Sequence, residues 1–162
     1  MTDLSDLRTL TAGLNAAMYN WSEEGVRKEL NAIMAKDMVV HMCHPFGDMP
    51  GDQYYESVLA KLHFSLPDVE KRPWIIMAGT DDHEDDWVGI AGTYIGTFVK
   101  PFLDIQPTGH LAHMRFHEYY KIKNEKIIEI QAIWDIPELM MQAGAWPMAP
   151  SLGREGLIPG PA

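Results

Sequence analysis

The chain has 162 residues, of which 46% are hydrophobic and 22% charged, proportions typical of one globular domain rather than of a disordered or fibrous protein. Its 23 acidic and 13 basic side chains leave a net charge of −10, without the cluster of Lys and Arg that a nucleic acid or an anionic membrane would require. We therefore expect a small-molecule ligand, with no nucleic acid and no membrane as partners. No apolar run spans a bilayer, no signal peptide is recognisable, and Cys43 is the only cysteine, so we expect a cytoplasmic protein.

Apolar residues recur every three or four positions in the first part of the chain and predict three helices. The first covers residues 6–21, and the second begins after Ser22, whose hydroxyl can cap it. A short strand over residues 38–42 separates the second helix from the third, which covers about 52–66 and ends at Pro67.

From residue 74 onward the residue pattern is typical of strands. Four strands are predicted, over residues 74–79, 87–99, 111–122 and 126–136. Helices followed by a meander of strands favour an α+β fold. We expect a single domain over residues 1–148, and an irregular tail rich in Pro and Gly over 149–162.

The last two strands are predicted to form a hairpin with a two-residue turn at Asn124-Glu125, since Asn tolerates a positive φ. This register places Met114 opposite Asp135 on one face. Phe116 and Glu118 lie on the same face, and if that face is concave, the Asp135 and Glu118 carboxyls lie in an apolar cavity. Desolvation there raises the pKa of a carboxyl and suits it to proton transfer. The alternative is that Glu118 and Glu129 lie at a solvated rim.

The other face of this hairpin carries Arg115, His117, Tyr119 and Trp134, with a cation–π pair expected between Arg115 and Trp134. This face is too aromatic for free solvent and too polar for a core. Such a composition is typical of a subunit interface.

The seven histidines raise the possibility of a metal site. His113 and His117 are four residues apart on a strand, roughly 13 Å, so they cannot share one ion. His41 and His44 converge only if the chain bends sharply at Cys43. We therefore expect no metal, and we expect Cys43 to be a small buried side chain rather than a nucleophile.

Several motifs resemble those of one family, and they occur in the family's order. The quoted motifs are Val39-Val40-His41 with Pro45 ("VxH…P"), Leu66-Pro67-Asp68 ("FPD"), Gly92-Thr93-Tyr94-Ile95-Gly96-Thr97-Phe98 ("GTHxGxF"), Ile105-Gln106-Pro107-Thr108-Gly109 ("PTG"), the turn over 124–128 ("DGKIV"), and Trp134-Asp135 followed by residues 139–144 ("D…GLLxQLG"). Over roughly residues 8–148 the chain resembles the SnoaL-like polyketide cyclases and ester cyclases of the nuclear transport factor 2-like superfamily.

The resemblance implies a cone-shaped α+β fold, in which a curved antiparallel sheet wraps around the N-terminal helices and encloses one pocket. It also implies a homodimer through the outer sheet face and no cofactor. The aspartate that acts as acid and base in the family's ring closure corresponds to Asp135. The chain departs from the family at Tyr94, which replaces a histidine, and over residues 129–132, where one carboxylate of "EHWD" is missing.

Two functions remain open from the sequence. The first is a cofactor-independent, cyclase-like lyase or isomerase that acts on an apolar or aromatic carbonyl compound, with Asp135 as the base and His41 or Tyr94 holding the enolate oxygen. The alternative is a non-catalytic protein that binds an aromatic or lipid-like molecule. Residues expected to bind the ligand are Tyr19, Trp21, Tyr55, Phe98, Met114, Phe116 and Glu118.

Overall fold

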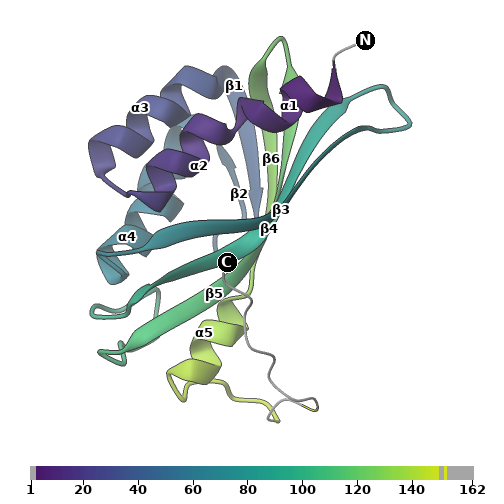
Figure 1. The fold of residues 1–162 in the computed structure, drawn as a ribbon. Coiled ribbons are helices and arrows are strands. Elements are labelled where there is room, and N and C mark those ends of the chain that lie inside the picture. The colour runs from purple at the N-terminus through teal and green to yellow at the C-terminus, as the bar shows by residue number, and fades with distance from the viewer. Residues whose placement is uncertain (1–2, 150–151, 153–162) are drawn as a thin grey trace.

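The computed structural model describes residues 3–149 and residue 152, and it has the predicted order of helices first and long strands afterwards (Figure 1). The elements are α1 (Leu4–Leu10), α2 (Ala12–Tyr19), α3 (Glu23–Ile33), β1 (Met34–Met42), β2 (Asp48–Pro50), a 3-10 turn (Gly51–Gln53), a π-helical turn (Tyr55–Leu59), α4 (Ala60–Ser65), β3 (Glu70–Thr80), β4 (Asp86–Thr97), β5 (Leu111–Lys123), β6 (Lys126–Trp134) and α5 (Ile136–Gln142). Apart from residues 149 and 152, the tail predicted over 149–162 lies outside the described residues.

The helices begin and end at recognisable signals. The predicted helix over 6–21 is two helices, α1 and α2, which meet at Thr11. The predicted cap at Ser22 is confirmed, because its Oγ accepts a hydrogen bond from the backbone N–H of Gly25. The predicted third helix is a succession of 3-10, π and α turns that ends at Ser65, with Leu66 as its C-cap before Pro67.

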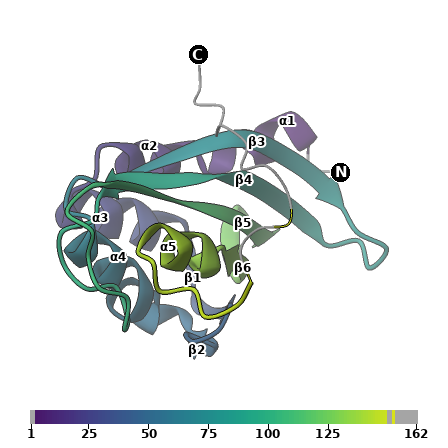
Figure 2. The same cartoon turned by 90° about the horizontal axis from the view of Figure 1, so that it is seen from below.

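The six strands form one sheet in the order β2-β1-β6-β5-β4-β3, so the predicted α+β class is confirmed. The neighbouring strands are antiparallel except β1 and β6, which are parallel. The sheet is strongly curved: α1, α2 and α3 lie along its hollow side, and α1 and α2 contact β3 (Figure 1). Helix α5 packs against β5, at the end of the molecule opposite α1 (Figure 1 and Figure 2). Within the described residues, no helix has the length and apolar character needed to cross a membrane.

The β5–β6 hairpin has the predicted turn but not the predicted register throughout. Asn124 and Glu125 both have positive φ, and Lys123 pairs with Lys126 as expected. A bulge then leaves Ile128 without a partner, so that Lys121 pairs with Glu129 instead of residue 128.

This bulge turns every later side chain of β6 to the opposite face, since side chains alternate along a strand. Trp134, predicted beside Arg115 on the outer face, instead pairs with Phe116 and is buried on the inner face. The expected cation–π pair with Arg115 is therefore wrong. Asp135 follows opposite Arg115, whose carbonyl accepts the Asp135 N–H at 2.9 Å, so its predicted position opposite Met114 is also wrong.

The two faces of the sheet differ sharply in exposure. The inward residues of β5, from Ala112 to Ile122 at every second position, are all buried. The outward residues between them are exposed or half-buried. The core therefore lies between the hollow face of the sheet and helices α1–α4.

Candidate interior site

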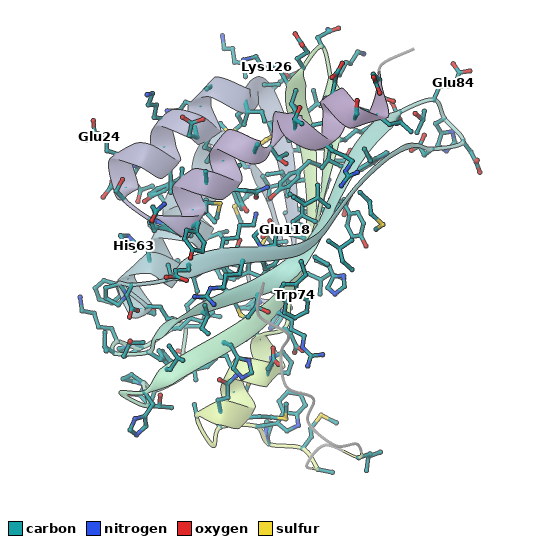
Figure 3. The ribbon with its side chains drawn as sticks, viewed as in Figure 1. Glu24, His63, Trp74, Glu84, Glu118 and Lys126 are labelled. Carbon is teal, nitrogen blue, oxygen red and sulfur yellow. The ribbon has the colours of Figure 1, made fainter. Side chains whose placement is uncertain are left out.

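Two opposite charges are buried completely inside the cone. Lys71, at the start of β3, and Glu118, in the middle of β5, each have 0% of their side chain exposed. The Lys71 Nζ lies 2.6 Å from Glu118 Oε2. Glu118 lies between the helices and the curved sheet, near the centre of the molecule (Figure 3). A buried pair of this kind has a large desolvation cost and adds little stability by itself.

Three aromatic side chains complete the hydrogen bonds of the carboxylate. Tyr94 Oη donates to Glu118 Oε1 at 2.7 Å, and Trp134 Nε1 donates to the same oxygen at 3.0 Å. Tyr120 Oη donates to Oε2, which also accepts from Lys71. Each carboxylate oxygen thus accepts two hydrogen bonds, which fills its ordinary capacity. We call these five residues, Lys71, Tyr94, Glu118, Tyr120 and Trp134, the Glu118 cluster.

The walls around the cluster are aromatic. The Tyr94 ring lies 4.7 Å from that of Phe116 and 5.0 Å from that of Trp134, measured between centroids. The Lys71 Nζ is 5.0 Å from the Phe116 ring centroid, close enough for a cation–π interaction. The charged groups thus lie in apolar surroundings, where electrostatic interactions are stronger than in water.

The surroundings shift the pKa values within the cluster. Burial raises the pKa of the Glu118 carboxyl, but the charge of Lys71 and the hydrogen bonds from Lys71 and the two tyrosines outweigh burial, and the pKa falls below its ordinary value of 4.5. Burial and the nearby Glu118 charge raise the pKa of Tyr94 and Tyr120 well above 10.0. Glu118 is therefore a carboxylate at neutral pH, and both phenols keep their protons.

A layer of aromatic rings separates the cluster from solvent on one side. Phe46, in the loop between β1 and β2, is half-buried and lies edge-on to the Trp134 ring at 5.9 Å. Phe102 is fully buried and lies 6.2 Å from Phe46. Phe46 therefore covers the Trp134 ring on this side of the cluster.

Four of the residues predicted to form the site lie on the inner face of the sheet, and a fifth, Phe98, follows the end of β4. Tyr94 and Glu118 are joined by a hydrogen bond, and Phe116 packs on Tyr94. Met114 and Phe98 are buried in the same core. Burial of the four strand residues follows directly from the alternation of side chains along β4 and β5.

Asp135 and His41 lie elsewhere. Asp135 caps α5, because its Oδ1 accepts the backbone N–H of Glu138 at 3.1 Å. The His41 ring Nδ1 is hydrogen-bonded to Asp48 at 2.8 Å, and its Nε2 is 4.0 Å from Glu129. His41 alternates with the buried residues of β1, so it belongs to the outer face, on the other side of the sheet from Glu118.

The aromatic residues predicted near the helices do not contact the cluster. Tyr19 is 44% exposed. The Trp21 ring stacks on that of His63, with centroids 5.5 Å apart. Tyr55 is buried, but it lies beneath the Arg27 guanidinium, 3.9 Å from the ring centroid.

Sequence reasoning missed three members of the cluster. Lys71 was missed because β3 begins at Glu70, whereas the strand predicted from the sequence begins only at residue 74. The alternation along β5 predicts Tyr120 on the face of Phe116 and Glu118, as the structure has it, but Tyr120 was not among the predicted site residues. Trp134 is predicted on the outer face because no feature of the sequence indicates the bulge at Ile128, which reverses the faces of the later residues of β6.

Comparison of the sequence with models of protein families gives a match to the SnoaL-like polyketide cyclases over residues 12–143. The chain belongs to the SnoaL-like polyketide cyclase family. Comparison with curated proteins found no match.

Solved structures support the same fold for this SnoaL-like chain. AclR, a candidate hydroxylase from Streptomyces galilaeus, superimposes with a TM-score of 0.74 at 19% identity, over 93% of this chain and 92% of that one. IdmH, a candidate polyketide cyclase from Streptomyces antibioticus, gives 0.69 at 21% identity, over 86% and 97%. A SnoaL-like protein from Jannaschia sp. CCS1 gives 0.68 at 18% identity, over 91% and 100%.

Proposed function

We propose that the chain is a cofactor-independent, cyclase-like lyase or isomerase, and that it removes a proton next to the carbonyl of an apolar compound. The observation that carries the proposal is the Glu118 cluster, an ionised carboxylate and two protonated phenols enclosed by aromatic rings. Proton abstraction next to a carbonyl needs a base and a donor to the developing oxyanion, and both are present there.

The proposed reaction begins with rotation of the Tyr94 hydroxyl away from Glu118. Tyr94 Oη now donates to Glu118 Oε1 at 2.7 Å. When the hydroxyl turns to a substrate carbonyl, one acceptor position of Oε1 becomes free. The α-carbon C–H bond then breaks, its proton passes to Oε1, and its electron pair forms the enolate, whose oxygen accepts from Tyr94. Tyr94 is the donor and Glu118 the base in this proposal, and Asp135 has no part in it.

A second function, binding without catalysis, is favoured by one observation. Both oxygens of Glu118 already accept two hydrogen bonds each, and the pKa of this carboxyl is lowered. A carboxylate in that state is a weak base and a good polar anchor for a bound molecule. The two functions predict different behaviour of the same variants.

Incorporation of deuterium separates the two functions without knowledge of the final product. The protein is incubated in deuterated buffer with a panel of apolar ketones and β-keto esters, and exchange at the α-carbon is followed by proton NMR. We expect catalysed exchange in the wild type and a fall of roughly 10²–10⁴-fold in Glu118→Gln and Tyr94→Phe. Tyr94→Phe keeps the Lys71–Glu118 ion pair, so it tests catalysis with the charges in place.

Matched controls lie on the neighbouring strands β5 and β6, on the outer face. Tyr119→Phe repeats the tyrosine change next to Tyr120, at a residue that is 42% exposed. Glu129→Gln repeats the carboxylate change on β6. Both controls are expected to exchange at the wild-type rate. A wild type that binds members of the panel without exchange would establish the binding function instead.

A further inference from the structure

The Glu118 cluster contains a positive charge that the proposed proton transfer does not use. Lys71 is completely buried, and its Nζ contacts Glu118 Oε2 at 2.6 Å and Tyr120 Oη at 3.1 Å. Its remaining surroundings are the faces of aromatic rings, including Phe116. Among the residues that the structure describes, all the polar contacts of this ammonium group are therefore within the cluster.

The arrangement also separates the two oxygens of Glu118. Oε2 faces Lys71 and Tyr120, whereas Oε1 faces Tyr94 and Trp134. Lys71 can therefore keep its contact with Oε2 while Tyr94 releases Oε1. One oxygen of the carboxylate is anchored, and the other can react.

We propose that Lys71 is the positioning residue of the interior site, which anchors Glu118 through Oε2 and balances the charge of the cluster while a proton moves to Oε1. Before the transfer, the ammonium and the carboxylate sum to zero. After it, Glu118 is neutral and the negative charge is on the enolate, a few ångströms away in the same apolar enclosure. The ammonium group then serves as the counter-ion of the enolate, so no uncompensated charge arises in a region of low dielectric constant.

This inference rests on the proposed function for its catalytic consequence, but its electrostatic basis can be measured separately. The carboxyl carbon of Glu118 is observed by NMR in protein labelled with carbon-13 glutamate, and Glu118→Gln identifies its signal. The chemical shift is followed as the pH is lowered. In the wild type we expect the carboxylate shift to persist below the ordinary carboxyl value of 4.5.

Two neutral variants divide the roles of Lys71. Lys71→Met removes the charge and the donor, and Lys71→Gln removes the charge but keeps an N–H donor. In both, burial without a counter-charge should move the titration of Glu118 above 4.5. The acid limb of the pH profile of α-deuterium exchange should move with it, and Lys71→Arg should restore both. Lys61→Met on α4 is the control and should change neither.

The outcomes separate this inference from the proposed function. A Glu118 titration that is the same in Lys71→Met and the wild type would overturn the inference, even if exchange is slower. A wild type without exchange but with the expected titrations would remove the proposed function and leave the anchoring role. If the neutral variants do not fold, the titration of Glu118 in the wild type still tests the inference. A Glu118 that titrates at or above 4.5 contradicts anchoring by Lys71.

Discussion

Lys71 and Glu118 form an ion pair with 2.6 Å between Nζ and Oε2, and neither side chain is exposed to solvent at all. The two residues are 47 positions apart in sequence, on strands β3 and β5, with β4 between them. Their side chains meet on the hollow side of the curved sheet, where Glu118 lies near the centre of the molecule (Figure 3). The consequences of this pair can be tested by stability, by pH and by substitution.

Removal of one member of the pair should destabilise the protein more than removal of both. Lys71→Met leaves a buried carboxylate without its counter-charge, and Glu118→Gln leaves a buried ammonium, so we expect losses of about 3–5 kcal/mol each. The double variant has no buried charge and should lie within about 1 kcal/mol of the wild type. Urea unfolding of the wild type, the two single variants and the double variant measures this double-mutant cycle. Additive losses in the double variant would show that the two charges do not act as a pair.

Stability should also fall in acid because of the same carboxyl. The pKa of Glu118 is lower in the folded protein than its ordinary value of 4.5, so the folded state binds the proton less readily than the unfolded state. The stabilisation is present above the unfolded value and is lost as the pH falls through the folded value. Glu138 and Asp68, whose pKa values are lowered by His113 and Thr97, contribute in the same direction.

Unfolding free energies measured by urea between pH 7 and pH 3 would test this dependence. We expect a plateau at the higher pH values and a decline below about 4.5. The double variant of Lys71 and Glu118 should decline less steeply, since it lacks one of the shifted carboxyls. An equal slope in both proteins would mean that Glu118 titrates normally.

Asp135 has a structural role at the start of α5 that can be measured apart from any chemistry. Its Oδ1 accepts the Glu138 N–H, and α5 in turn holds β5 through Gln142, which bonds both the N–H and the carbonyl of His113. Asp135→Ala should therefore cost about 0.5–2 kcal/mol, whereas Asp135→Asn should cost little, because Asn is an equally good cap. Thermal unfolding of both variants and the wild type measures these losses of stability. Loss of deuterium exchange in Asp135→Asn at unchanged stability would assign the base to Asp135 instead of Glu118.

The predicted homodimer remains a prediction, and the outer face of the sheet offers a surface for it. Ile75 and Ile133 lie in one cross-strand row, and Met77 and Tyr119 in the next. Their exposed fractions are 49%, 65%, 57% and 42%, so four large apolar or aromatic side chains share one exposed face. A surface of this kind is typical of an interface between subunits.

We expect sedimentation velocity to give a dimer at micromolar concentration, and Ile133→Lys to give a monomer, because a charge would be buried without a partner. Phe64→Lys on α4 is the matched control, since Phe64 is 57% exposed and lies away from that face. A wild type that sediments as a monomer would contradict the dimer. Dissociation by Phe64→Lys instead would place the interface at the helices.

The local pattern of the sequence was sufficient to predict helices followed by long strands, the α+β class, the cap at Ser22 and the turn at Asn124-Glu125. These features depend on short-range rules, namely helical spacing, capping and the tolerance of Asn for positive φ. The alternation along β5 also placed Phe116 and Glu118 together on the inner face, as the structure has them. The motifs shared with the family were enough to predict the fold.

Only the tertiary structure decided which residues complete the site. The bulge at Ile128 turned Trp134 inward and moved Asp135 to the cap of α5, and a single unpaired residue in a ladder has no local signature in this hairpin. The parallel pairing of β1 with β6 is likewise a contact between distant segments. Lys71 lies outside the strands predicted from the sequence, and in the structure it is buried on β3 in contact with Glu118 on β5. A charge can remain there because its counter-charge, which is provided by a distant strand, offsets the cost of leaving water.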